Sequence, residues 1–176
     1  MLLVVAATQR ELEGAGAAES LACGIGPVEA AASTARALAD RLPNAVLHVG
    51  VAGARGIPTG TIVIGSAAIY EDARGPLVHQ RVEPDPDLLA AARRALPDAR
   101  VLPIGTSARV GGTSDCQVEG MEGFSVLRAA ALTGVPALEL RAVSNDIDEA
   151  DRSRWRLDDA LVALADAVRT LLPELL

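Results

Sequence analysis

The sequence predicts one α/β domain, residues 1–176, in which helices cover both faces of a mixed, largely parallel sheet as a three-layer sandwich. Two observations support this prediction. Apolar runs of strand length alternate with segments of helical periodicity, without an internal repeat or a linker between them. Half of the residues (50%) are hydrophobic, which in a chain of this length is enough to bury one sizeable core.

The first half of the chain begins with residues 2–7, a continuous apolar run typical of a strand that is buried on both faces. The polar sequence TQRE follows this run and marks its carboxyl end, where functional groups commonly lie. A short helix is expected over 10–14, and Pro27 stands at the first position of a longer helix with an apolar stripe. The other strands expected in this half cover residues 45–52 and 61–70.

The second half continues the alternation of helices and strands. A helix is expected over 122–133, because Gly134 and Pro136 close it as they often close helix C-termini. The remaining elements expected here are a short helix over 86–96, strands over 100–107 and 136–144, and an amphipathic helix over 157–172.

Composition excludes several classes of protein. All sixteen basic residues are arginines, so Schiff-base lysines and P-loop lysines are excluded. The formal charge of -7 is spread along the chain without a basic cluster, and no apolar stretch has the length of a membrane span, so we expect neither a nucleic-acid nor a membrane partner. Cys23 and Cys116 are too few and too isolated for zinc. We expect no metal, no cofactor and a cytoplasmic location.

Four segments carry a family resemblance. They are ATQREL (7–12), the pair CGIGPVEAAAST (23–34) and HVGVAGA (48–54), and VEGMEGFSVLRAAALTGVPALELRAVSN (118–145). In this order they resemble the purine nucleosidase and nucleoside phosphorylase superfamily, with details similar to its futalosine hydrolases, and they span nearly the whole chain. The resemblance implies a nucleoside phosphorylase-like fold, a small-molecule purine nucleoside as partner, and a homodimer.

Met121 and Glu122 match the ribose-binding step of that family. The resemblance implies that Glu122 accepts hydrogen bonds from the 2′- and 3′-hydroxyls of the sugar. A carboxylate suits a vicinal diol, and its charge favours an electron-deficient sugar ring. The alternative is that Glu122 only caps a helix N-terminus, where negative charge is also favourable. Glu119, three residues earlier, is interpreted as solvated or as a supporting partner.

Asn145 stands where relatives that act on adenine derivatives carry an Asp that protonates the purine N7. An amide cannot deliver a proton, but it can pair with the edge of a 6-oxopurine. This departure favours a substrate that carries hypoxanthine. Two alternatives remain, because Asp146 could face the base instead and Asn is also common as a plain turn residue.

The water-activating carboxylate of the family has two candidate positions here. Simple register with adenine nucleosidases points to Gln9, whereas the spacing A-T-x-x-E-L points to Glu11, the only one of the two able to act as a base. The alternative for Glu11 is a solvent-facing position on a short helix.

His48 and Val51 stand where related phosphorylases hold phosphate with an Arg and a Ser, which favours hydrolysis over phosphorolysis. His48 itself is interpreted as a core histidine, and Glu139 with Arg141 as a structural ion pair. The residues that remain as possible phosphate ligands are Arg10, Arg36 and Arg55.

The resemblance also implies which residues surround the base. Ala52 and Gly53 would form a small wall beside it, and the loop SARVG (107–111) would line the pocket around Val110. The leading hypothesis is an N-ribosyl hydrolase that releases hypoxanthine from futalosine in menaquinone biosynthesis. The alternatives are a methylthioadenosine/S-adenosylhomocysteine nucleosidase, a purine nucleoside phosphorylase, and a nucleoside-binding protein without turnover.

Overall fold

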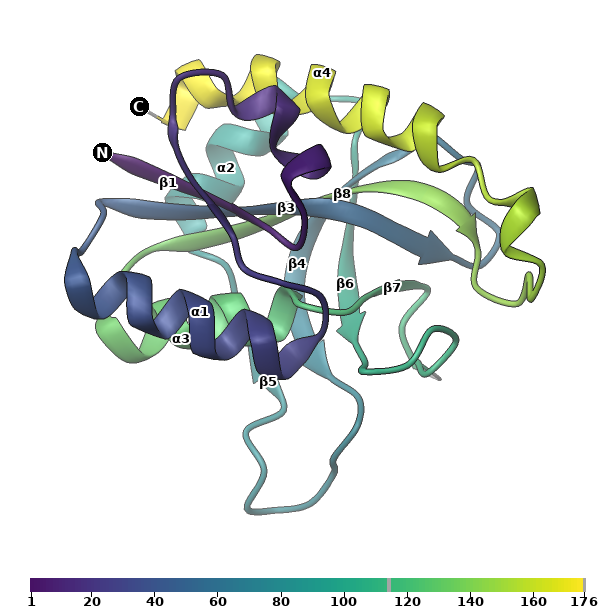
Figure 1. Cartoon of the computed structure of the whole chain (residues 1–176), viewed down its shortest axis with the longest axis horizontal. Coiled ribbons are helices and arrows are strands. Elements are labelled where there is room, and N and C mark those ends of the chain that lie inside the picture. Colours follow the sequence, from purple (N-terminus) through teal and green to yellow (C-terminus); the bar gives the residue numbers. More distant parts are fainter. Residues whose placement is uncertain (114, 176) are drawn as a thin grey trace.

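The computed structural model describes residues 1–113 and 115–175 (Figure 1). The strands in these residues are β1 (Leu2–Ala6), β2 (Glu19–Ala22), β3 (Ala45–Ala54), β4 (Ile62–Tyr70), β5 (Arg81–Val82), β6 (Arg100–Thr106), β7 (Val118–Gly120) and β8 (Ala137–Asp146). The helices are α1 (Pro27–Asp40), α2 (Pro86–Ala95), α3 (Gly123–Thr133) and α4 (Leu157–Leu175), with short 3-10 helices η1 (Gln9–Ala15) and η2 (Arg152–Arg154).

One mixed sheet contains all of these strands, in the order β2-β1-β3-β7-β6-β4-β5. Strand β8 lies off this path and pairs parallel with β3 and antiparallel with β4. Because β3, β7, β6, β4 and β8 each pair with the next, the sheet closes on itself. The mixed sheet was predicted correctly, but closure of the sheet means that the three-layer sandwich is not confirmed.

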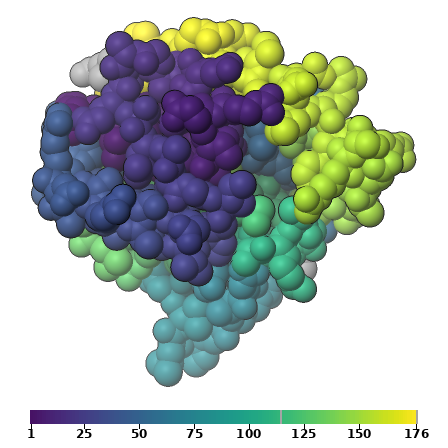
Figure 2. All heavy atoms as spheres, in the orientation of Figure 1, coloured from purple at the N-terminus to yellow at the C-terminus, as the bar shows by residue number. Residues whose placement is uncertain are grey.

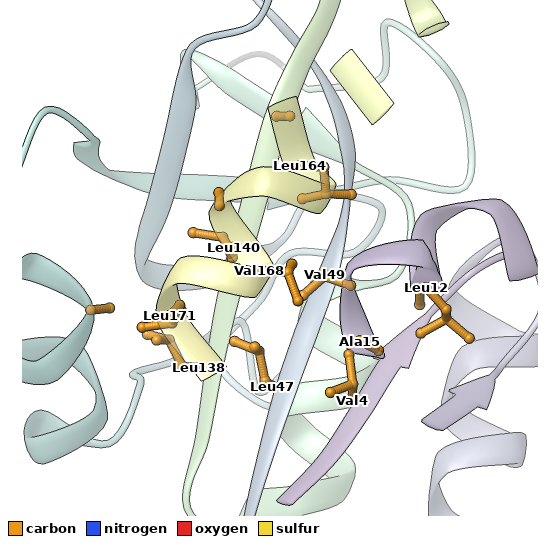
Figure 3. Packing of buried hydrophobic residues seen from close by; sticks show 14 of the residues in the cluster. Val4, Leu12, Ala15, Leu47, Val49, Leu138, Leu140, Leu164, Val168 and Leu171 are labelled. Atoms are coloured by element: carbon orange, nitrogen blue, oxygen red, sulfur yellow. The ribbon is translucent and has the colours of Figure 1, made fainter. Parts of the chain in front are cut away.

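Helices pack on both sides of the sheet (Figure 1). Helix α4 packs with η1 and α2 on one side, and α1 packs with α3 on the other. Side chains alternate between the two sides along each strand, so Val4 and Val5 belong to different hydrophobic clusters. Figure 3 shows the cluster under α4, in which helical residues lie close to side chains of β3 and β8: Leu47, Val49, Leu138, Leu140, Leu164, Val168 and Leu171.

Most predicted elements form within a few residues of their expected bounds. Pro27 is the first residue of α1, and Gly134 ends α3 in the left-handed conformation (φ 70°), which glycine adopts without strain. The helix expected from Glu122 begins at Gly123, and the short helix near residue 10 is a 3-10 helix. Strands β2, β5 and β7 were not predicted, because two to four residues are too short for an alternating pattern.

The topology brings one set of strand ends together. Strands β1, β3 and β8 run parallel as neighbours, so their carboxyl ends share one edge of the sheet. Crevices outside the carboxyl ends of strands are where ligands bind in α/β proteins. No helix in the described part of the chain combines the length and the apolar character needed to cross a membrane.

Candidate active site

A cavity of about 630 Å³ lies at this edge, within the size range of small-molecule sites. Its walls come from η1, the ends of β3 and β8, the loop after β6, the β7–α3 junction, and the segment from η2 into α4. Figure 2 shows the purple atoms of the N-terminal segment, the green atoms of the β6–β7 region and the yellow-green atoms before α4 around a hollow. Segments that are distant in the sequence therefore build one site.

The structure brings all of the sequence-predicted site residues to this cavity. Those that line it are Glu11, Ala52, Gly53, Val110, Met121, Glu122 and Asn145. The two rival residues, Gln9 and Asp146, are exposed and do not line the cavity. Of the alternatives that the sequence left open, Glu11 and Asn145 are therefore the ones that line the cavity.

Glu122 is buried, with 4% of its surface exposed, and it lies immediately before α3. Its side chain makes no capping hydrogen bond to that helix. Instead Oε1 accepts a hydrogen bond from the backbone N–H of Gly26 at 3.0 Å, and Oε2 lies 3.5 Å from Nη1 of Arg141. A carboxylate has about four acceptor sites, so this arrangement leaves capacity for two sugar hydroxyls.

Glu11 is also buried (7% exposed), so the solvent-facing alternative is wrong. Oε2 accepts hydrogen bonds from the backbone N–H of Thr8 at 3.0 Å and from its hydroxyl at 2.8 Å. Oε1 accepts a third from the backbone N–H of Val51 in β3, at 3.1 Å. The carboxylate is thereby fixed between η1 and β3, where it faces the cavity.

Behind these two carboxylates lies a buried group that we call the Arg141 network: Glu122, Glu139, Arg141 and His48. Arg141 donates from Nε to Glu139 Oε1 at 2.8 Å, and its Nη2 lies 2.7 Å from His48 Nε2. Nη1 donates to the carbonyl oxygen of Val51 at 3.1 Å. The predicted ion pair and the predicted core histidine are therefore confirmed, but the sequence did not show that they belong to one network that reaches Glu122.

Two glycines make room for Arg141. A Cβ atom at Gly50 would lie 2.3 Å from Nη1, and one at Gly120 would lie 2.9 Å from the guanidinium carbon. Real Cβ contacts are never that short, so a larger residue at either position would displace the guanidinium from its partners.

The charge state of the network follows from its hydrogen bonds. Arginine only donates and a carbonyl only accepts, so His48 donates from Nδ1 to the Val5 oxygen (3.0 Å) and accepts at Nε2. Burial, and then the charge of Arg141, lowers the pKa of His48 well below its usual 6.5. Burial opposes the charge of Arg141, but Glu139 and Glu122 outweigh this effect and raise its pKa. Burial raises the pKa of Glu139.

At the end of β8, the Asn145 side chain is held by its own neighbours. Its Oδ1 accepts a hydrogen bond from the Ser144 hydroxyl at 2.8 Å, and its Nδ2 donates to the Asp146 carbonyl oxygen at 2.9 Å. The pairing of β3 with β8 shifts register between Ala52 and Gly53, beside this residue. One N–H and one lone pair of the amide remain for a ligand, which is the complement of a 6-oxopurine edge.

Glu119 is a supporting partner, which is one of the two interpretations that the sequence allowed. It is buried (5% exposed), so the interpretation as a solvated side chain is wrong. Its two oxygens accept hydrogen bonds from the backbone N–H groups of Gly111 and Thr113, both at 2.6 Å. Asp72 holds the start of the same loop through Ala108 N–H at 2.7 Å. Acidic side chains therefore fix the loop that carries Val110 over the cavity.

Some of the aromatic residues and candidate phosphate ligands line the cavity, and others lie elsewhere in the structure. Trp155 lines the cavity, whereas Tyr70 and Phe124 stack on each other with ring centroids 5.2 Å apart and do not line it. Among the candidate phosphate ligands only Arg10 lines the cavity. Arg55 pairs instead with Asp148 at 3.2 Å.

Comparison with known proteins finds nucleosidases among the similar chains. A futalosine hydrolase of Streptomyces coelicolor is 38% identical over 188 residues, which cover 88% of this chain and 78% of that protein. The native structure of futalosine hydrolase from Helicobacter pylori has a TM-score of 0.88 at 16% identity, covering 98% of this chain and 97% of that one.

An MTA/SAH nucleosidase from Colwellia psychrerythraea, solved in complex with adenine, has a TM-score of 0.86 at 20% identity, with coverage of 99% and 95%. These two structural likenesses confirm the nucleosidase-like α/β fold. The family model of the Phosphorylase superfamily matches residues 20–175, which is most of the chain. Together with the 38% identical relative, this match shows that the chain belongs to the phosphorylase superfamily.

Proposed function

We propose that this chain is a nucleosidase that hydrolyses the N-glycosidic bond of futalosine and releases hypoxanthine for menaquinone biosynthesis. The observation that carries the proposal is the amide of Asn145 in the cavity, with one donor and one acceptor free. The 38% identity to a futalosine hydrolase supports the same substrate.

In the proposed reaction, the bond between the sugar and the purine breaks ahead of water attack. Its electron pair leaves with the base, which Asn145 steadies by hydrogen bonding and which takes a proton from water. Glu122 binds the sugar hydroxyls and its charge stabilises the oxocarbenium-like ring. Glu11 takes one proton from the water whose oxygen bonds to the sugar carbon and passes it to the solvent, which restores the proton that the departing base has taken from solvent water. Ala52, Gly53, Val110 and Met121 shape the space around the base and the ribose.

Hydrolysis is favoured over phosphorolysis by the residues at the end of β3. Val51 offers phosphate no hydrogen-bond donor from its side chain, and the Glu11 carboxylate that accepts its N–H would repel an anion there. Arg10, the remaining candidate ligand, lies on η1 with its side chain 63% exposed, not at the end of β3 where the related phosphorylases hold the anion. An adenine-specific nucleosidase is disfavoured because Asn145 cannot protonate N7.

We further propose that the protein acts as one domain, in the cytoplasm, and as a homodimer. Ile25 and Val28 are 62% and 77% exposed, and Ile25 lines the cavity. Apolar side chains so placed suit a surface that a second copy would cover, next to the site.

The proposal is tested by following hypoxanthine release through coupled xanthine oxidase, with futalosine and inosine, and by following base release from adenosine and methylthioadenosine. Each assay is run in phosphate-free buffer and again with phosphate added. We expect futalosine to be the best substrate and phosphate to be without effect. A strict phosphate requirement would reassign the chain to the phosphorylases. Tight binding without base release would favour a nucleoside-binding protein.

A further inference from the structure

The charged residues that line the cavity separate by depth. Its three carboxylates, Glu11, Glu119 and Glu122, are all buried, with at most 7% exposed. Its three arginines are all exposed: Arg10, Arg109 and Arg152. The chain as a whole carries a formal charge of -7, so a positive cavity edge does not follow from average composition. We call Arg10 and Arg152 the rim.

The rim arginines are available to a ligand. Arg10 pairs with Asp158, but their side chains are 63% and 88% exposed, and such pairs exchange readily with solvent or a ligand. Arg152 pairs with no carboxylate among the described residues. Its neighbours behave differently, because Arg154 pairs with Glu149 at 2.9 Å and Arg156 pairs with Asp159.

An apolar strip adjoins the rim. Trp155, Leu157 and Leu161 line the cavity on the α4 side, and the guanidinium carbon of Arg152 lies 5.6 Å from the Trp155 ring centroid. The Trp155 indole is anchored by a hydrogen bond from Nε1 to the carbonyl oxygen of Glu149 at 3.2 Å. A ligand that extends along this wall meets apolar surface first and cationic groups at its end.

The position of this wall indicates which part of a nucleoside would reach it. With the base at Asn145 and Val110 and the ribose at Glu122, the lining residues left over come from η1 and the start of α4, which the Arg10–Asp158 pair brings together. The substituent on the 5′ carbon of the sugar is the group that points away from both base and diol. We infer that Arg10 and Arg152 bind an anionic group, a carboxylate or a phosphate, at the end of an apolar 5′ substituent that lies against Trp155.

This inference rests on the proposed function, because it takes the orientation of the nucleoside from that proposal. It assigns substrate selection to a part of the cavity that takes no part in bond breaking. The arginines provide planar donor forks that suit carboxylates and phosphates alike, so the length of the substituent has to separate the two.

The experiment measures dissociation constants by calorimetry on a Glu11→Gln background, which is designed to bind the nucleoside without consuming it. The probes are futalosine, whose 5′ substituent carries a carboxylate, its carboxyl methyl ester, inosine, and inosine 5′-phosphate. Each is measured with Arg10→Gln, Arg152→Gln and the control Arg154→Gln, which leaves the cavity lining unchanged. We expect each rim variant to raise the Kd of futalosine about tenfold, and less at high salt.

The Kd values of the ester and of inosine should not change in the rim variants, and Arg154→Gln should behave as the parent protein does. If inosine 5′-phosphate loses affinity and futalosine does not, the rim binds an anion carried directly on the 5′ oxygen, and the inference of an apolar substituent along Trp155 is overturned. Equal losses for futalosine and its ester, or no loss for either, would overturn the inference while hydrolysis by the unsubstituted enzyme still stands. If the rim variants show the expected charge preference in binding but the unsubstituted enzyme does not hydrolyse futalosine, the inference about the rim stands and the proposed function is wrong.

Discussion

The Arg141 network and the rim are built from the same kinds of charged groups in opposite surroundings. In the network, Arg141 is 1% exposed, and its donors are committed to partners on β3, β8 and the start of α3. At the rim, Arg10 keeps one exposed partner and Arg152 rests on an aromatic ring. A charge interaction is far stronger in a dry interior than in water. Fixed charges therefore suit bond breaking, and exposed charges suit recognition of a substrate's end.

The difference between the two regions has a kinetic consequence. Removing a charge beside the reacting sugar changes the energy of the transition state more than that of bound substrate, so kcat falls. Removing a rim charge raises the free energy of the bound substrate and that of the transition state equally, so KM rises.

The largest effect is expected from Glu11→Gln, which keeps the shape of the side chain but removes the base. We expect kcat with futalosine to fall by about 100- to 10,000-fold, the usual range for general-base catalysis. Steady-state hypoxanthine release measures it. Glu13→Gln is the matched control, because Glu13 is an exposed carboxylate on the same 3-10 helix. Similar losses in both variants would show damage to η1 rather than loss of a base.

Glu122→Gln comes next, with a fall in kcat of about 100- to 1000-fold and little change in KM. The amide can still bind sugar hydroxyls, but it carries no charge to balance the cationic ring. Far-UV circular dichroism and thermal unfolding check that the variant folds, since Glu122 also faces Arg141 at 3.5 Å. Near-normal turnover in a folded variant would show that Glu122 does not stabilise the transition state.

A smaller effect concerns the choice of base. We expect Asn145→Asp to shift the ratio of kcat/KM for futalosine over aminofutalosine by about tenfold or more towards aminofutalosine, because a protonatable carboxyl can supply N7. Asp146→Asn should leave the ratio unchanged, since Asp146 is exposed outside the cavity. A wild-type enzyme that already prefers aminofutalosine would contradict the assignment of Asn145.

The smallest effect is on stability, through His48. Its folded pKa is depressed, so as pH falls below 6.5 the unfolded chain binds a proton that the folded chain does not, and stability is lost. At pH 5.5 this linkage costs about 1 kcal/mol relative to pH 7.5. His48→Gln keeps an acceptor for Arg141 without titrating. Urea unfolding at both pH values should therefore show a smaller acid loss in the variant, and an equal loss would mean that His48 is protonated in the folded protein.

The sequence predicted those parts of the structure that depend on local pattern. Pro27 and Gly134 mark helix ends through their own backbone preferences. Met121 and Glu122 were assigned to the site from the short sequence around them, and both line the cavity. Burial of Glu119 was not predictable, because its partners belong to a loop whose return is set by β6 and β7. Closure of the sheet likewise depends on the pairing of β4 with β8 far along the chain.

The separation of chemistry from recognition is tested most directly by single-turnover hydrolysis of futalosine, with enzyme in excess over nucleoside. The rate of hypoxanthine release at saturating enzyme is compared for the wild type, Glu122→Gln and Arg152→Gln. We expect Glu122→Gln to slow this rate by about 100-fold or more, whereas Arg152→Gln should reach the wild-type rate and only require more enzyme to do so. A reduced limiting rate in Arg152→Gln, or an unchanged one in Glu122→Gln, would contradict it.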